Sequence, residues 1–470
     1  MKKTTLLEKL NFHFPHSPTT EQSSVFTDIN DYVLTLGNKN IFILKGYAGT
    51  GKTTLVSSLI KSLPSIGKRS VLLAPTGRAA KVLSRYSKKK ASTIHKKIYW
   101  IRTTKTGNTY ITLKENTHTN TIFIVDEASM IPEDSKDSLG NRSLLKDLIQ
   151  YIYEGVDCKL ILIGDTAQLP PIHLEISPAL DEERIELNYS KHTICRELKK
   201  VVRQKNNSLI LENATNIRTL ILNQNYIFPK FSVNHEVIRI NSGEELQDYI
   251  ESAYSQSGVE NTTVICKSNK RANQYNSRIR SEIRWQEDLI SAGDILMIVR
   301  NNYFWLDEDS DAGFLANGDI VEVTRIQQII KRYGFKFAKA SIKLLDYPKE
   351  KELETVLLLD TIEYETPSLS YNNYQKLYKE VGLDYKGQKE INKKIKENKY
   401  FNAIQIKFAY AITCHKSQGG QWERVFVDLG YFTDDMLDKS FLRWLYTALT
   451  RATQKLYLIN FKENFFNTIK

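Results

Sequence analysis

Short continuous runs of apolar residues recur along the first half of the chain, and most of them end in a polar cluster. Residues 41–44 lead into a glycine-rich stretch, residues 71–74 into a helical pattern, and residues 121–125 into two acidic side chains. Such runs, separated by helical patterns, are typical of buried strands in a parallel sheet with helices on both faces. Because ligands of these sheets bind at the carboxyl ends of the strands, we expect the polar clusters to surround one ligand.

The same alternation returns in the second half, with apolar runs at residues 262–266, 408–412 and 423–429. It predicts a second α/β unit that lacks a glycine-rich loop of its own. The length of 470 residues agrees with this, because it exceeds what one ordinary core accommodates.

Two segments interrupt these units. Residues 86–118 carry a basic run followed by a hairpin pattern with Gly107 in its turn, and residues 302–402 change to short alternating strands. The sequence therefore predicts an α/β protein with two parallel-sheet cores, a hairpin insertion and a β-rich accessory domain. The expected boundaries are 1–85 and 119–188 for the first core, 86–118 for the hairpin, 189–301 and 403–470 for the second core, and 302–402 for the accessory domain.

The glycine-rich stretch GYAGTGKTT stands between a predicted strand and a predicted helix. It matches the phosphate-binding pattern G-x-x-x-x-G-K-[ST], in which backbone N–H groups and a helix N-terminus point at the phosphates of ATP. Lys52 would reach the β- and γ-phosphates, and the Thr53 hydroxyl would bind Mg²⁺. The expected nucleotide contacts here are Gly46, Ala48, Gly49, Thr50, Gly51, Lys52, Thr53 and Thr54.

Two further polar clusters suit ATP hydrolysis. Asp126 would hold Mg²⁺ together with Thr53, and Glu127 would polarise the attacking water. Gln168 follows the next apolar run and could report the presence of the γ-phosphate. A polar loop stiffened by Pro170 and Pro171 is an equally good explanation, and the sequence leaves both open.

Charge and cysteine content narrow the class of protein. The chain carries 66 Lys and Arg against 54 Asp and Glu, a formal net charge of +12. This excess favours a polyanionic partner such as nucleic acid, although a solvated basic surface has the same composition. Four scattered cysteines without a C-x-x-C pair, and a start without a long apolar segment, predict a reduced, cytoplasmic protein with no membrane span.

Three stretches, APTGRAAK, STIHKKIYW and TCHKSQGG, combine hydroxyls, basic groups and small residues near strand ends. This mixture suits contacts to nucleic-acid phosphates, with Trp100 available to stack on a base. Each residue also has an ordinary structural explanation: Thr76 as a helix cap, His95 or His415 as a core histidine, and Trp100 as core packing.

Taken in order, these stretches resemble the motifs of the superfamily 1 helicases of the 5′-to-3′ branch, the RecD/Dda-like group. The nucleotide motifs are SPTTEQSSVF, KGYAGTGKTTL, FIVDEASM, LIGDTAQLPPI, LKKVVRQKNNSLI and LRWLYTALTRATQKLYLI. The strand motifs are LLAPTGRAAKVLS, STIHKKIY and YAITCHKSQGGQWERVFVDL. The matches span nearly the whole chain, and Cys414 inside the last motif is a small departure that should not disturb phosphate contacts.

The resemblance implies two RecA-like P-loop cores that clamp one ATP between them. Gln22 would contact the adenine, while Arg203 and Arg451 of the second core would contact the γ-phosphate. The hairpin would be a strand-separating pin with Trp100 or Tyr110 as its wedge, and the accessory domain would be SH3-like. The residues implied to contact single-stranded DNA are Pro75, Thr76, Arg78, Thr93, His95, Trp100, Thr413, His415 and Lys416.

The function expected from these features is an ATP- and Mg²⁺-dependent 5′-to-3′ DNA helicase that acts as a monomer on single strands and on junctions with duplex. Such motors serve DNA replication, repair and recombination. Two alternatives stay open: a translocase that moves on single strands without separating duplex, and a nucleic-acid-binding switch regulated by ATP. The expected catalytic residues are Lys52, Asp126, Glu127, Gln168, Arg203 and Arg451.

Overall fold

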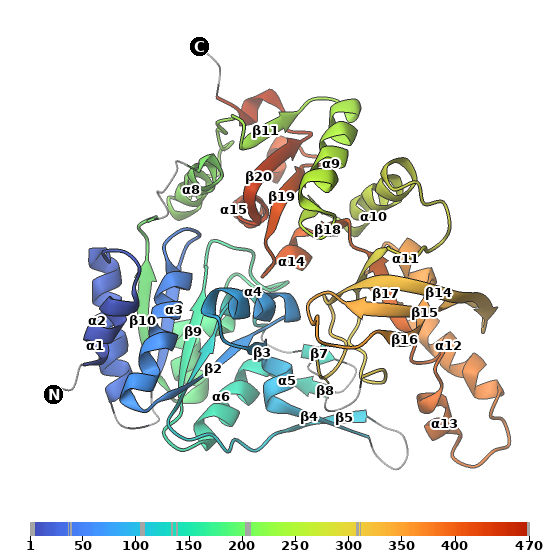
Figure 1. The fold of residues 1–470 in the computed structure, drawn as a ribbon, viewed down its shortest axis with the longest axis horizontal. Coiled ribbons are helices and arrows are strands. Elements are labelled where there is room, and N and C mark those ends of the chain that lie inside the picture. The colour runs from blue at the N-terminus through green and yellow to red at the C-terminus, as the bar shows by residue number, and fades with distance from the viewer. Residues whose placement is uncertain are drawn as a thin grey trace.

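Six parallel strands form the first sheet, in the order β10-β1-β9-β6-β2-β3 (Figure 1). The computed structural model describes residues 5–35, 37, 40–103, 109–132, 135–137, 140–202, 208–306, 310 and 312–467. The strands of this sheet are β1 (Asn40–Gly46), β2 (Arg69–Ala74), β3 (Ala91–Thr93), β6 (Thr121–Val125), β9 (Lys159–Gly164) and β10 (His192–Leu198). The predicted parallel α/β fold is confirmed.

Helices cover both faces of this sheet because alternate strand residues point to opposite sides. Phe42 and Leu44 pack with the helices on one face, whereas Ile41 and Ile43 pack with those on the other. The first group contains α1 (Leu6–His13), α2 (Thr20–Leu34), α3 (Lys52–Ser62) and α4 (Gly77–Ser87), and the second α5 (Ile94–Ile98), α6 (Leu144–Glu154) and α7 (Glu182–Tyr189).

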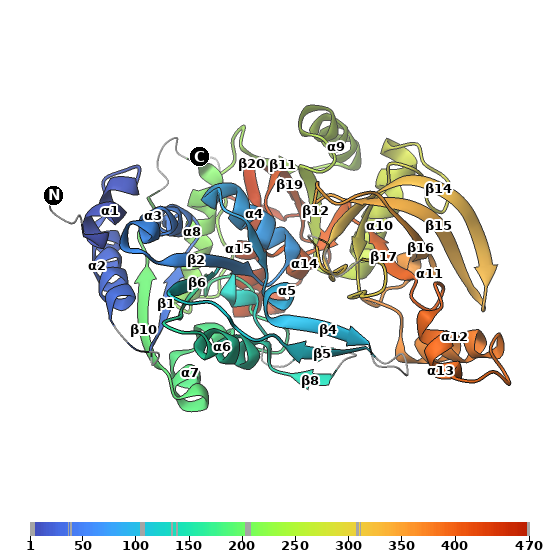
Figure 2. The same cartoon turned by 60° about the horizontal axis from the view of Figure 1, so that its bottom comes forward.

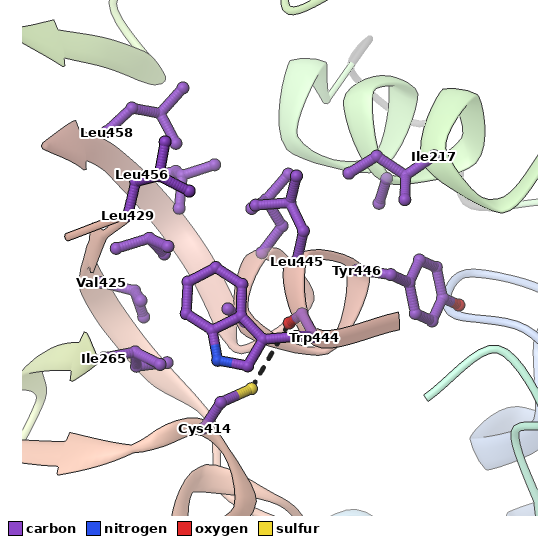
Figure 3. Packing of buried hydrophobic residues seen from close by; sticks show 14 of the residues in the cluster. Ile217, Ile265, Cys414, Val425, Leu429, Trp444, Leu445, Tyr446, Leu456 and Leu458 are labelled. Atoms are coloured by element: carbon purple, nitrogen blue, oxygen red, sulfur yellow. Dashed lines mark hydrogen bonds between the residues drawn. The ribbon is translucent and has the colours of Figure 1, made fainter. Parts of the chain in front are cut away.

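A second parallel sheet has the order β11-β20-β19-β12-β18. Its strands are β11 (Val237–Ile240), β12 (Thr262–Cys266), β18 (Ala411–Thr413), β19 (Trp422–Asp428) and β20 (Ala452–Ile459). Helices α8 (Leu209–Leu222) and α15 (Lys439–Leu449) pack on one face, and α9 (Gly243–Ser257) and α10 (Asn269–Arg278) on the other. Figure 3 shows Trp444 and Leu445 of α15 packed against Leu456 and Val425 of the strands.

The accessory domain is a closed five-stranded barrel joined to the second core. Its strands are β13 (Ile295–Ile298), β14 (Ile320–Arg332), β15 (Phe335–Leu344), β16 (Leu353–Leu358) and β17 (Ile404–Phe408). Its apolar interior continues into the α9 and α10 face of the second sheet. The helices α11 (Asp360–Glu363), α12 (Tyr371–Leu383) and α13 (Ile391–Glu397) follow β16, and α14 (Cys414–Ser417) follows β18.

Two hairpins project from the first core. The predicted one pairs β4 (Tyr99–Thr103) with β5 (Thr109–Leu113), and its turn, with Gly107, lies outside the described residues. The other, β7 (Ser135–Asp137) with β8 (Gly140–Arg142), was not predicted from the sequence. Figure 2 shows both below the sheet of the first core, on the side where the barrel lies.

Four expected boundaries are wrong. Residues 91–93, assigned to the hairpin, form β3 of the first sheet, and the boundaries at 188/189, 301/302 and 402/403 are each displaced by one strand. Residues 192–198, assigned to the second core, form β10, which pairs in parallel with β1 along its whole length. This edge strand, HTICREL, mixes polar and apolar residues in pairs and therefore gave no continuous apolar run. The barrel similarly takes in β13 and β17, which lie on either side of 302–402. No helix in the described part of the chain is long and apolar enough to cross a membrane.

Candidate nucleotide and strand site

The phosphate-binding loop connects β1 to α3, whose first residue is Lys52. Gly49 and Gly51 have φ angles of +78° and +88°, a left-handed conformation that residues with a Cβ rarely adopt. The Lys52 ammonium donates hydrogen bonds to the carbonyl oxygens of Gly46 and Tyr47, at 2.6 and 2.8 Å. The lysine therefore lies over the loop at the place where a phosphate would be cradled.

Gln22 lies directly behind this loop. Its backbone N–H is bonded to the Thr19 hydroxyl in the cap of α2, and its side-chain amide donates to the Thr50 carbonyl oxygen at 3.1 Å. A Cβ atom on Gly51 would come within 2.6 Å of that amide nitrogen. The structure thus places Gln22 beside the nucleotide loop, and its contact with adenine stays a prediction.

The paired acids follow β6. Glu127 has φ 54°, and its N–H donates to Asp126 Oδ1 at 2.9 Å, so the two carboxyl groups are held in a tight turn. The Tyr86 hydroxyl of α4 donates to the other Asp126 oxygen. Burial raises the pKa of Glu127 to about 7, against the opposing effects of the Arg451 and Lys52 charges. A carboxyl group with such a pKa suits proton acceptance from water.

The same residues fit Mg²⁺. Both Asp126 oxygens are fixed by hydrogen bonds, and the Thr53 side chain is exposed at the start of α3. Among the described residues, no three His, Cys, Asp or Glu side chains gather in a metal cluster. Mg²⁺ is commonly held by one or two protein oxygens plus waters and phosphates, which Asp126 and Thr53 could supply.

The loop after β9 joins the two cores. Asp165 Oδ1 accepts a hydrogen bond from the Ala167 N–H at 2.9 Å, which fixes the turn before Gln168. The Leu169 N–H donates to the Thr447 hydroxyl at 2.8 Å, and Gln418 donates to the Leu169 carbonyl oxygen at 2.6 Å. Gln168 itself is buried, and its Oε1 has no hydrogen-bond partner in the described structure. An unpaired buried acceptor is costly, and a polar ligand at this position would satisfy it, so the role of Gln168 stays a prediction.

Arg451 belongs to the second core and is only 4% exposed. Its Nε donates to the Thr447 carbonyl oxygen at 3.0 Å and one terminal nitrogen to the Gly420 carbonyl oxygen at 3.3 Å. Its charge lowers the pKa of Glu127, which belongs to the first core. The charge of Arg451 therefore acts across the junction of the two cores, while Arg203 lies outside the described residues.

The predicted strand residues of the first core cap two helices. The Thr76 hydroxyl accepts the Ala79 N–H at the start of α4, and the Thr93 hydroxyl accepts the Lys96 N–H at the start of α5, both at 3.2 Å. The cap interpretation of Thr76 is thus correct, and it leaves the hydroxyl at a helix N-terminus, where anions bind. Pro75, half-buried, precedes that cap.

Arg78 instead links the two cores. Its guanidinium carbon lies 3.9 Å from the ring centroid of Trp422 on β19. A Cβ atom on Gly419 would come within 2.8 Å of the Ala79 Cβ, so the loop after α14 packs directly on α4. The strand stretches of the two cores therefore adjoin each other.

The remaining strand residues lie at two places. His415 is exposed and Thr413 and Lys416 half-exposed around α14, and burial, with the Lys407 charge, lowers the pKa of Lys416 to about 8. His95 lies near Tyr99, with 5.7 Å between ring centroids, and Trp100 is 45% exposed on the hairpin. Cys414 points inward, donating to the Trp444 carbonyl oxygen at 3.4 Å (Figure 3).

Residues 30–219 match the family model of an AAA domain, and residues 408–459 match that of a UvrD-like helicase C-terminal domain. The ATP-dependent DNA helicase dda of enterobacteria phage T4 is 25% identical over 91% of this chain and 99% of its own length. The ATP-dependent DNA helicase Pif1 of Campylobacter jejuni is 25% identical over 93% of both chains. These matches make the chain similar to the superfamily 1 helicases of the UvrD, RecD, Dda and Pif1 type. A solved structure of a Bacteroides Pif1 helicase, with ADP-AlF3 and single-stranded DNA, gives a TM-score of 0.46 at 16% identity over 96% of this chain and 95% of its own.

Sequence reasoning missed several residues of this site. Tyr86 contacts Asp126, and Tyr446 contacts Ala48 of the phosphate loop. The sequence around each tyrosine does not predict these contacts, because the partners lie 40 and 398 positions away. A cavity of about 160 Å³ separates the hairpin from the barrel. Trp100 and Lys114 line it from the hairpin side, and Tyr303 and Phe314 from the barrel side.

Proposed function

We propose that this protein is an ATP- and Mg²⁺-dependent 5′-to-3′ DNA helicase that moves along single strands and separates duplex. The observation that carries the proposal is the hydrogen-bonded junction of the two cores at the phosphate loop, where Tyr446 of the second core accepts the Ala48 N–H of the first and the charge of Arg451 acts on Glu127. A cation supplied from another domain stabilises the charge that develops on a transferring phosphoryl group. Hydrolysis then requires both cores to be closed, which couples chemistry to domain movement.

The first core supplies the remaining groups. Lys52 and the loop N–H groups hold the phosphates, Thr53 and Asp126 hold Mg²⁺, and Glu127 accepts a proton from the attacking water. Bound Mg²⁺ neutralises phosphate charge. The unpaired side-chain oxygen of Gln168 accepts a hydrogen bond from the attacking water beside the γ-phosphate, and Gln168 so reports the nucleotide state.

Movement follows from alternating grips on the strand. Thr76 and Thr93 hold phosphates from the first core, and Thr413 and Lys416 hold them from the second. ATP draws the cores together and hydrolysis releases them, so the two grips advance in turn. The hairpin β4–β5 divides the duplex ahead. The protein acts as a monomer on single strands and junctions. The relatives dda and Pif1 are named as ATP-dependent DNA helicases, which supports the helicase activity.

The test offers the purified protein ATP, Mg²⁺ and duplexes with a single-stranded tail on the 5′ or the 3′ side. Separation of only the 5′-tailed duplex is expected. Separation of only the 3′-tailed duplex contradicts the polarity. Strand-stimulated hydrolysis without separation of either duplex favours a translocase, and hydrolysis that ignores DNA favours an ATP-regulated switch.

A further inference from the structure

One tyrosine of the second core bonds two nucleotide-facing loops of the first. The Tyr446 hydroxyl accepts a hydrogen bond from the Ala48 N–H of the phosphate loop and donates one to Asp165 Oδ2, both at 2.8 Å. Figure 3 shows its ring directed away from the apolar face of α15, with the hydroxyl toward the adjoining core. The side chain is 1% exposed, and burial raises the pKa of Tyr446 far above its usual value. The neutral hydroxyl therefore uses its donor and an acceptor position at once.

The same helix holds the loop after β9 and the predicted arginine finger. Asp165 fixes the Ala167 N–H with its second oxygen, and Thr447 accepts the Leu169 N–H at 2.8 Å. Arg451 is tied to the last turn of α15 through the Thr447 carbonyl oxygen, at 3.0 Å. A displacement of the phosphate loop at Ala48 therefore reaches Arg451 through one short, hydrogen-bonded helix.

A second contact holds the neighbouring loop residue. The Arg218 guanidinium of α8 lies 4.6 Å from the ring centroid of Tyr47, whose carbonyl oxygen accepts from Lys52. The Tyr47 hydroxyl donates to Glu197 Oε1 at 2.6 Å, so this ring is fixed from both cores. Helices α8 and α15 pack together, and each contacts one of two adjacent residues of the phosphate loop, Tyr47 and Ala48.

We propose that Tyr446 is a positioning residue that couples occupation of the phosphate loop to the placement of Arg451. This proposal rests on the proposed ATP-dependent function. Its physical basis is that an ångström-scale misplacement of a catalytic group costs about a hundredfold in rate, whereas ground-state binding depends mainly on the loop itself. Tyr446 hydrogen-bonds Ala48 and Asp165 and none of the residues assigned to Mg²⁺, the attacking water or the strand, so its removal should affect turnover far more than affinity.

The test compares Tyr446→Phe with Tyr410→Phe. Tyr410 is an unusually close match: it is also 1% exposed, donates to Asp294 Oδ1 at 2.8 Å and accepts the Ile295 N–H at 3.2 Å, beside the barrel. Both variants keep the ring and lose two buried hydrogen bonds, so they should lose comparable thermal stability. Strand-stimulated kcat should fall about tenfold or more in Tyr446→Phe alone, with KM for ATP changed less than about threefold.

Equal kcat in the two variants, or a loss in KM rather than kcat, overturns the proposal. If Tyr446→Phe does not fold, Asp165→Asn serves instead, because it keeps an acceptor for the hydroxyl while removing the charge. It should lower kcat by a smaller factor, and an unchanged kcat in that variant contradicts the coupling. The readout is hydrolysis, so a wild-type protein that hydrolyses ATP without separating duplex would refute the helicase proposal and leave this test valid.

Discussion

At the phosphate loop, the Lys52 ammonium donates hydrogen bonds to two carbonyl oxygens and so brings a positive charge to the expected phosphate position. The Lys52→Ala variant should lose ATP hydrolysis while keeping most of its affinity for single-stranded DNA, because the strand residues lie elsewhere. Hydrolysis assays and fluorescence anisotropy of a labelled strand measure the two properties. Lys61→Ala, at the exposed end of the same helix, is the control and should hydrolyse normally. Normal turnover in Lys52→Ala would refute the assignment of the loop.

We expect the affinity for single-stranded DNA to depend on pH through Lys416. Burial and the Lys407 charge lower its pKa to about 8, and a phosphate at this position would raise that pKa again. The bound state therefore keeps a proton that the free protein loses above pH 8. The affinity for single-stranded DNA should be constant below pH 7 and fall by up to about tenfold per pH unit above pH 8.

Lys416→Arg isolates this effect, since arginine stays charged throughout the range. Anisotropy titrations of single-stranded DNA from pH 6.5 to 9 should give a flat profile for this variant over the interval in which the wild type declines. Parallel declines in both proteins would mean that another group is responsible.

At the scale of elements, the strands that the sequence predicted best are those buried on both faces. β1, β6 and β9 are continuous apolar runs because helices cover them on both sides. The edge strand β10 has exposed positions and no such run, and the three-residue strands of β7–β8 are too short for any pattern.

The sequence also predicted some residues of the candidate site and missed the contacts of others. Asp126 and Glu127 could be predicted because two neighbouring residues and one preceding strand define them. The contacts of Tyr446 join positions 398 and 281 residues apart, so only the folded arrangement of two cores produces them. The placement of residues within one contiguous motif was predictable, and the individual hydrogen bonds between motifs were not.

The hairpin β4–β5 can be tested as an element. Trp100 is 45% exposed on β4, and the Lys114 ammonium lies 4.3 Å from its ring centroid. Because base–aromatic stacking contributes about 1–3 kcal/mol, Trp100→Ala should slow duplex separation by about fivefold or more. Strand-stimulated hydrolysis should fall less. Trp285→Ala removes an 81% exposed tryptophan outside the hairpin and should separate duplex normally in the same gel assay. Equal losses in both activities of Trp100→Ala argue against a role at the junction.

At the scale of the whole molecule, the barrel closes over the first core. Lys81 of α4 forms an ion pair with Asp346 at 3.2 Å, and Lys96 donates to the Ser310 carbonyl oxygen at 2.8 Å. A Cβ atom on Gly77, at the start of α4, would lie 2.6 Å from Asp319 Oδ1. The barrel therefore contacts α4 beside Thr76, and we expect a strand bound at Thr76 to meet it.

A strand bound at Thr76 should therefore move the barrel away from α4. Spin labels at Lys88→Cys and Lys343→Cys, both exposed positions, report this distance in a Cys195→Ser background. Addition of single-stranded DNA should lengthen it, and an unchanged distance with saturating DNA contradicts the prediction.

The contact between the barrel and α4 should also depend on pH, because Asp319 lies in it. Burial raises the pKa of Asp319 to about 8, with a further contribution from Asp346, while Arg78 and Lys81 are the cations nearby. An opened barrel returns Asp319 to water and to its ordinary pKa near 4, so opening releases a proton at neutral pH.

Raising the pH from 6.5 to 8.5 without DNA should therefore lengthen the label distance in a growing fraction of molecules. Asp319→Asn should abolish that shift, whereas Glu354→Gln, an exposed acid on β16, should retain it.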